Sequence, residues 1–121
     1  MSLVSFEVMS ASTQFSRSYG ALLGLAIGDA LGMPTQSLSY EVIREQFHKV
    51  NTFNDPSPQH PYAAGLKAGM VTDDTEQSLL VASLLTSLNG EFDQREFAKQ
   101  LISWEVSIRD RGLLDLSLIH I

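Results

Sequence analysis

Apolar residues recur along most of the chain at helical spacing, and this pattern predicts a protein built from helices. Four helices are expected, over residues 18–33, 39–47, 73–88 and 93–106. The first should end where Gly32 and Pro34 interrupt the pattern, and the third where Asn89 and Gly90 do.

The fourth predicted helix has the clearest start signal in the chain. Asp93 is expected to be its N-cap, with Glu96 three residues further on, and Phe92 can pack against Phe97 as a hydrophobic staple. Four leucines of the third helix are expected to keep one of its faces in the core: Leu79, Leu80, Leu84 and Leu88.

Glycines spaced four residues apart line one side of the first predicted helix: Gly20, Gly24, Gly28 and Gly32. Because glycine costs about 1 kcal/mol relative to alanine inside a helix, this spacing indicates either a close approach by another helix or a nearby ligand. Apolar side chains cover the other faces, so the helix is expected to be buried on most sides. The apolar run is too short to span a bilayer, and it contains Asp29. A carboxylate in such a helix is expected either to be hydrogen-bonded or to act directly in a site, and both interpretations stay open.

The run Thr72-Asp73-Asp74-Thr75 carries the strongest candidate chemistry. Its consecutive hard oxygen groups suit a hard divalent cation such as Mg²⁺. Successive helical residues fan out by about 100°, so Asp73 and Asp74 can each face one of two ions but cannot both chelate the same ion from one face. The alternative is structural, because Asp73 followed by Glu76 also fits a capping box at a helix start.

Composition narrows the class of protein. A chain of 121 residues with 44% hydrophobic content has room for one domain with a core. A formal charge of −6 without a basic run argues against a nucleic-acid partner. The absence of cysteine excludes disulfides and thiolate metal sites and fits a cytoplasmic protein. Residues 1–16 show no signal-peptide pattern and are expected to form a loosely ordered leader.

Taken in order, Gly28-Asp29-Ala30-Leu31-Gly32 and then Thr72-Asp73-Asp74-Thr75 resemble the ADP-ribosylglycohydrolase family, which includes the dinitrogenase-reductase-activating glycohydrolases. The resemblance implies a compact, orthogonal all-α fold with a binuclear magnesium site. Residues 17–115 would form the N-terminal part of that fold. It also implies hydrolysis of the N- or O-glycosidic bond that joins ADP-ribose to a protein side chain or to a small compound.

The resemblance further assigns Thr72, Asp73 and Asp74 as metal ligands, and Thr75 as a fourth ligand or a group just behind them. Asp73 and Asp74 are the candidate catalytic residues. Several family members carry a glutamate near the metal site or the catalytic water, where this chain has Gln36. A glutamine is neutral and cannot act as a general base. The remaining ligands belong to an aspartate-x-aspartate-threonine motif towards the family's C-terminus, and this chain does not contain that motif.

Residues 50–69 are rich in proline, glycine, asparagine and aspartate and are predicted to form a long irregular loop. Such a loop is usually functional, and its place just before the aspartate pair makes it a candidate substrate lid. Lys67 and Tyr62 are candidates to contact pyrophosphate and adenine, although a solvated surface role is favoured for each.

The family resemblance stops near residues 113–115. Residues 116–121 match the translation of a transposon-end adapter used in sequencing libraries and are expected to be a foreign tail, with a genuine apolar chain end as the alternative. On this view the chain is an N-terminal fragment that is inactive by itself and marginally folded. The rival hypothesis for function is a non-catalytic ADP-ribose-binding or structural, crystallin-like protein, which the neutral Gln36 favours.

Overall fold

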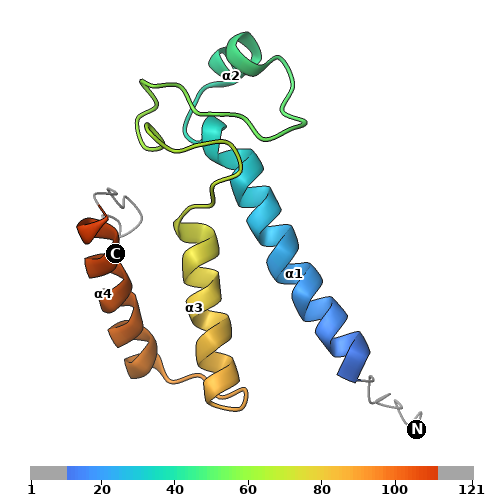
Figure 1. The fold of residues 1–121 in the computed structure, drawn as a ribbon, viewed down its shortest axis with the longest axis vertical. Helices are drawn as coiled ribbons and strands as arrows, with labels where there is room; N and C mark the ends of the chain where they lie inside the picture. The colour runs from blue at the N-terminus through green and yellow to red at the C-terminus, as the bar shows by residue number, and fades with distance from the viewer. Residues whose placement is uncertain (1–10, 112–121) are drawn as a thin grey trace, which may run out of the picture.

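The computed structural model describes residues 11–111, and within this range every regular element is a helix (Figure 1). The elements are α1 (Ala11–Gly32), the 3-10 helix η1 (Met33–Thr35), α2 (Tyr40–Phe47), α3 (Asp73–Ser87) and α4 (Gln94–Asp110). The all-α prediction is therefore confirmed for the described residues. The suspected tail, residues 116–121, lies outside them.

Helix α3 is central to the arrangement. It packs against α1 on one side and against α4 on the other, so that the three long helices form one layer (Figure 1). The short α2 and the loop after it lie at the end of the layer where α1 finishes and α3 begins. This end therefore brings together the glycine-rich part of α1 and the Thr72–Thr75 segment, which are far apart in the sequence.

Helix α1 begins at Ala11, earlier than the predicted start at Ser18. Residues 11–16, which were expected to belong to a loosely ordered leader, are therefore helical. One reason is an aromatic pair that spans the predicted boundary, because the rings of Phe15 and Tyr19 stack with centroids 5.8 Å apart. Side chains four residues apart are neighbours on a helix surface, and such pairs favour the helical form.

The predicted N-cap of α4 is confirmed, and α2 also has a side-chain N-cap. The Ser39 hydroxyl accepts the Val42 N–H at 3.4 Å. Asp93 Oδ1 accepts the backbone N–H groups of Arg95 and Glu96 at 2.8 and 3.1 Å. The staple before α4 is also formed, with the rings of Phe92 and Phe97 5.4 Å apart. These signals are local, so the sequence alone was sufficient to locate them.

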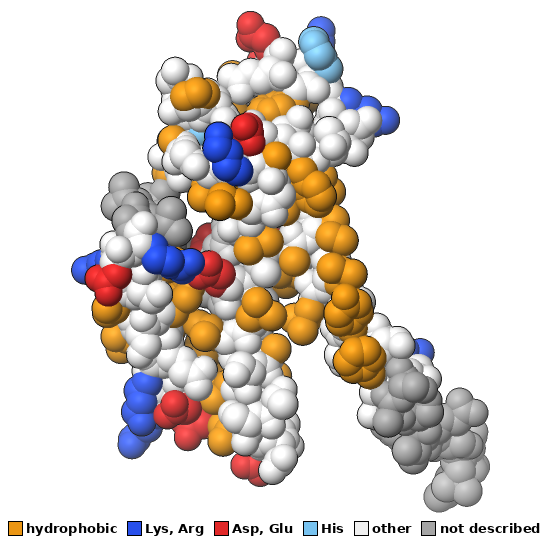
Figure 2. Space-filling model, in the orientation of Figure 1, with side chains coloured by type: hydrophobic (Ala, Val, Ile, Leu, Met, Phe, Trp, Pro, Cys, Tyr) orange, Lys and Arg blue, Asp and Glu red, His pale blue; other side chains and the backbone are white. Residues whose placement is uncertain are grey.

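The core of the described residues is small and centred on the contacts of α3. Its buried apolar side chains in the helices are Ala30, Met33, Pro34, Leu84, Trp104 and Ile108. The prediction that α1 is buried on most sides is wrong for this part of the protein, because Leu23 and Ile27 are 45% and 42% exposed. Leu79, expected in the core, is 51% exposed. Figure 2 shows hydrophobic side chains along the length of α1. Helical spacing reveals which face is apolar but not whether another element covers it.

None of the described helices is both long enough and apolar enough to cross a membrane.

The segment between α2 and α3 is irregular, as predicted, and it is organised around a buried histidine. His60 is only 3% exposed, and its Nδ1 accepts the backbone N–H groups of Tyr62 at 3.1 Å and Ala63 at 2.8 Å. Because Nδ1 accepts two hydrogen bonds, the ring proton of the neutral imidazole must lie on Nε2. Asp55 also fixes the loop by accepting the Ala68 N–H at 2.7 Å. No pattern in the sequence marks this role of His60.

Replacing His60 with alanine should loosen this loop. The change leaves two backbone N–H groups, one of them buried, without their acceptor, at a cost of about 1–3 kcal/mol for each unsatisfied group. We expect faster cleavage between residues 50 and 69 in limited proteolysis. His60→Asn is the matched control, because its side-chain oxygen can accept the same N–H groups in a turn and should retain most of the protection. Equal cleavage of His60→Ala and the unmodified chain would contradict this role.

Candidate functional site

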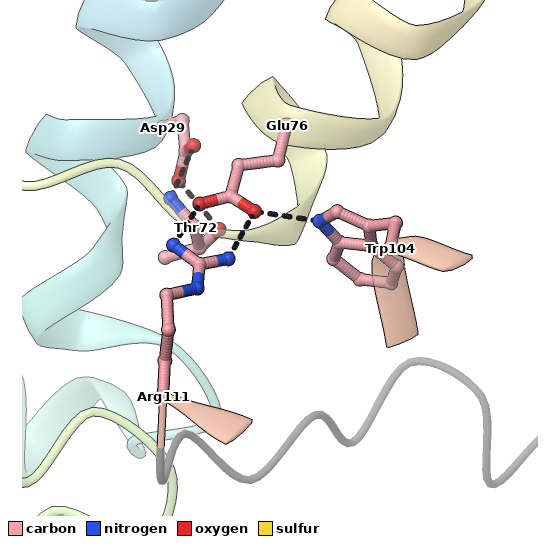
Figure 3. A network of polar contacts seen from close by, with 5 residues as sticks. All are labelled: Asp29, Thr72, Glu76, Trp104 and Arg111. Carbon is pink, nitrogen blue, oxygen red and sulfur yellow. Dashed lines mark hydrogen bonds and ion pairs between the residues drawn. The ribbon is translucent and has the colours of Figure 1, made fainter. Parts of the chain in front are cut away.

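Asp29, near the end of α1, ties that helix to the start of α3 (Figure 3). Its Oδ2 accepts the Thr72 N–H at 2.8 Å, and its Oδ1 accepts the Thr72 hydroxyl at 2.7 Å. The Thr75 hydroxyl also donates to Oδ2, at 2.5 Å. Thr72 and Thr75 lie 43 and 46 residues beyond Asp29, so these contacts exist only in the tertiary structure. The structure shows Asp29 as a hydrogen-bonded carboxylate, the first of the two interpretations that the sequence left open.

The start of α3 differs from the predicted capping box. Thr72, not Asp73, is the N-cap residue, and its side chain makes no cap hydrogen bond to the helix. The Glu76 carboxylate does not fold back onto the helix start but points to α4. The physical reason is competition between partners, since Asp29 engages Thr72, while Glu76 finds stronger donors on α4. The acidic residues in the first turn of α3 still interact favourably with the positive end of the helix dipole.

Glu76 anchors α3 from the opposite side (Figure 3). Its Oε2 accepts the indole N–H of Trp104 at 2.6 Å, and Arg111 donates to both carboxylate oxygens at 3.1 and 2.8 Å. The hydrogen bond from Arg111 is the main reason that the pKa of Glu76 lies below its ordinary value, and the Trp104 bond lowers this pKa further. Trp104 is 8% exposed and packs against α3.

An open groove of about 570 Å³ runs along the glycine-lined side of α1 to the start of α3. Its walls are formed by Gly24, Leu25, Gly28, Asp29, Gly32, Met33, Gln36, Thr72, Asp74 and Ser78. A Cβ atom placed on Gly24, Gly28 or Gly32 would meet no atom within 4 Å among the described residues. Of the two explanations for the glycine spacing, a close helix approach is therefore wrong for this part of the protein. Space for a ligand is consistent with the groove.

The two adjacent aspartates point in different directions, as expected from the rotation of about 100° between successive residues of a helix. Asp74 lines the groove, whereas Asp73 is not among the groove residues. Neither carboxylate accepts a hydrogen bond from the described residues. Partial burial raises the pKa of Asp74, and the nearby negative charges of Asp73 and Asp29 raise it further. The local field therefore disfavours another negative charge and favours a cation.

The other residues singled out by sequence divide into two groups. Gln36, which follows η1 as its C-cap, lines the groove together with Thr72 and Asp74. Lys67 and Tyr62 do not line it. Lys67 instead forms an exposed ion pair with Asp55, with 3.6 Å between Nζ and Oδ2, as expected for a solvated surface role. Thr75 is 5% exposed and is not among the residues that line the groove.

The donor atoms at the start of α3 fit part of a site for a hard divalent cation. Each threonine hydroxyl uses its single O–H to donate a hydrogen bond to Asp29, so its lone pairs remain available. With the Asp73 and Asp74 carboxylates they make an all-oxygen set, the type that Mg²⁺ prefers. Within residues 11–111, no three acidic, histidine or cysteine side chains gather as a metal site. These residues therefore supply only part of the coordination shell of such a cation.

This fold and groove define an all-helical protein with an oxygen-rich site at the junction of two helices. Residues 10–117 match the sequence profile of the ADP-ribosylglycohydrolases. The chain therefore belongs to the ADP-ribosylglycohydrolase family, as its two motifs indicated.

Several known proteins share this part of the sequence. An ADP-ribosylarginine hydrolase, Tri1, of Pseudomonas putida is 40% identical over 73% of this chain and 21% of its own length. The ADP-ribosyl-[dinitrogen reductase] glycohydrolase of Rhodospirillum rubrum is 32% identical over 79% of this chain and 31% of its own length. An uncharacterized protein of Archaeoglobus fulgidus is 44% identical over 76% of this chain and 28% of its own length. The chain thus spans less than a third of these relatives. No solved structure matches it significantly.

Proposed function

We propose that the full-length protein is a Mg²⁺-dependent ADP-ribosyl glycohydrolase, which releases ADP-ribose from a modified protein side chain. The observation that carries the proposal is the junction of Asp29 with Thr72 and Thr75, which links the Thr-Asp-Asp-Thr run to α1. Two residues of this run, Thr72 and Asp74, line the groove. The names of the two ADP-ribosyl hydrolases among the relatives support the same activity. Because one of them is named for ADP-ribosylarginine, arginine-linked ADP-ribose is the first substrate to test.

The groove residues suggest how such a substrate would be held. The bare backbone of Gly24, Gly28 and Gly32 leaves room for a sugar or phosphate group to lie against α1. Thr72, Asp73, Asp74 and Thr75 would hold the cations, which would supply Lewis-acid contacts to ribose hydroxyls and to a water. Gln36 can orient a hydroxyl or a water through its amide, but it cannot take up a proton. If the reaction uses a general base, that base would therefore have to be a carboxylate at a position other than Gln36.

Removing the metal provides the test. Full-length protein is incubated with an ADP-ribosylated arginine peptide, and released ADP-ribose is measured after treatment with EDTA and again after addition of excess Mg²⁺. We expect EDTA to abolish release and Mg²⁺ to restore it, because an all-oxygen site binds such ions reversibly. Full release after exhaustive chelation would overturn the metal-dependent proposal.

A second candidate function is a non-catalytic protein that binds ADP-ribose, and Gln36 is the observation that favours it. This neutral side chain lines the groove where several family members are expected to carry an acid. Calorimetry with ADP-ribose in the presence of Mg²⁺ separates the two functions. Binding without turnover on ADP-ribosylated arginine or serine peptides would favour the binding protein.

A further inference from the structure

The contacts of Asp29 point to a role beyond joining two helices. The carboxylate has two oxygens, and together they accept three donors from one short segment, namely the N–H and hydroxyl of Thr72 and the hydroxyl of Thr75. A helix N-cap residue would normally use its own side chain at this place. The Thr72 side chain makes no such bond. Its hydroxyl is thus committed to α1 instead of to its own helix.

The hydrogen bonds to Asp29 determine how both threonine hydroxyls can interact with any further partner. A hydroxyl carries one proton and two lone pairs, and it can rotate to present either to a neighbour. Donation to Asp29 uses the proton of each threonine, so each oxygen can act only as an acceptor towards any other partner. An ionised acceptor also makes these hydrogen bonds stronger than bonds between neutral groups. Both threonine oxygens are thereby held as ready ligands for a positive centre.

We infer that Asp29 is a positioning residue of the cation site, which acts by orienting the Thr72 and Thr75 oxygens. The inference rests on the proposed function, because it requires that the Thr-Asp-Asp-Thr run binds divalent cations. Groups that orient metal ligands typically change metal affinity by about 10–100-fold when they are removed. The structure offers no other hydrogen-bond acceptor for these two hydroxyl protons among its described contacts.

Mn²⁺ serves as a paramagnetic probe of the site, and its affinity for the full-length protein is measured by electron paramagnetic resonance. Asp29→Asn keeps the size of the side chain but replaces one accepting oxygen with a donor. We expect this variant to bind Mn²⁺ about 10–100-fold more weakly. Glu76→Gln is the matched control, because it removes one negative charge from the other anchor of α3 without touching the threonines. Its Mn²⁺ affinity should stay within about twofold of the unmodified protein.

A double-mutant cycle distinguishes positioning from direct ligation. If Asp29 acts through the threonine hydroxyls, its replacement should cost less affinity in a Thr72→Val background than in the unmodified protein. Independent, fully additive losses would overturn the inference. It would also be overturned if Asp29→Asn bound Mn²⁺ normally, or if Glu76→Gln lost as much affinity at a similar melting temperature. If the unmodified protein bound no Mn²⁺, the proposed function would fail and the inference with it, whereas the other outcomes leave the proposed function standing.

Discussion

Asp74→Ala in the full-length protein should lower kcat for ADP-ribose release by about 10²–10³-fold. Asp74 is the aspartate that faces the groove, and its carboxylate sits beside two other negative charges. Its removal would take away a cation ligand and with it Lewis-acid stabilisation worth several kcal/mol. Each 1.4 kcal/mol corresponds to about tenfold in rate, which gives this range. The measurement is steady-state release of ADP-ribose from an ADP-ribosylated arginine peptide at saturating Mg²⁺.

Asp110→Ala is the matched control for that experiment, because Asp110 is an exposed aspartate at the end of α4 and away from the groove. It should retain kcat within about twofold, since surface substitutions rarely change stability by more than about 0.5 kcal/mol. Circular dichroism of each variant checks that the helices are intact. Retention of half of the activity by a well-folded Asp74→Ala protein would show that the groove is not the reaction site.

Leu84→Ala should unfold the 121-residue chain or bring it close to unfolding. Leu84 has 0% exposure and lies in α3, the helix that packs against both α1 and α4. Truncating a buried leucine to alanine costs about 2–5 kcal/mol, the spread depending on how far the cavity collapses. Domains are typically stable by only about 5–15 kcal/mol, and the small core described here favours the low end. Urea unfolding followed by circular dichroism measures the loss.

Leu79→Ala gives the comparison within the same helix. Leu79 is 51% exposed, so its truncation removes little buried surface and should cost less than about 1 kcal/mol in the same chain. The sequence places the two leucines in one apolar group, and only the structure separates them. Similar losses from the two substitutions would show that the core is not centred on Leu84.

Much of the local architecture follows from the sequence because its determinants are close together along the chain. Ser39 and Asp93 cap helices whose N–H groups lie two or three residues away, so the residues that form the cap are also the residues that reveal it. The turn after α3 follows in the same way from Asn89 and Gly90, whose φ angles are 52° and 92°. The Thr-Asp-Asp-Thr run likewise shows its chemistry in its composition, since its oxygen groups are consecutive.

Only the tertiary structure decided how those groups are arranged. Whether α3 would start from its own capping box or from an external carboxylate depended on whether Asp29, 43 residues before Thr72, came within hydrogen-bond distance. The hydrogen-bond partners of Glu76 are Trp104 and Arg111, which lie 28 and 35 residues beyond it, and no local sequence pattern marks them. The glycine spacing is compatible with a helix contact and with an open groove. Among the described residues no other helix lies close to these glycines, and three of them line the groove. Sequence spacing sets which side chains share a face, but which donors and acceptors meet across that face depends on how the helices pack.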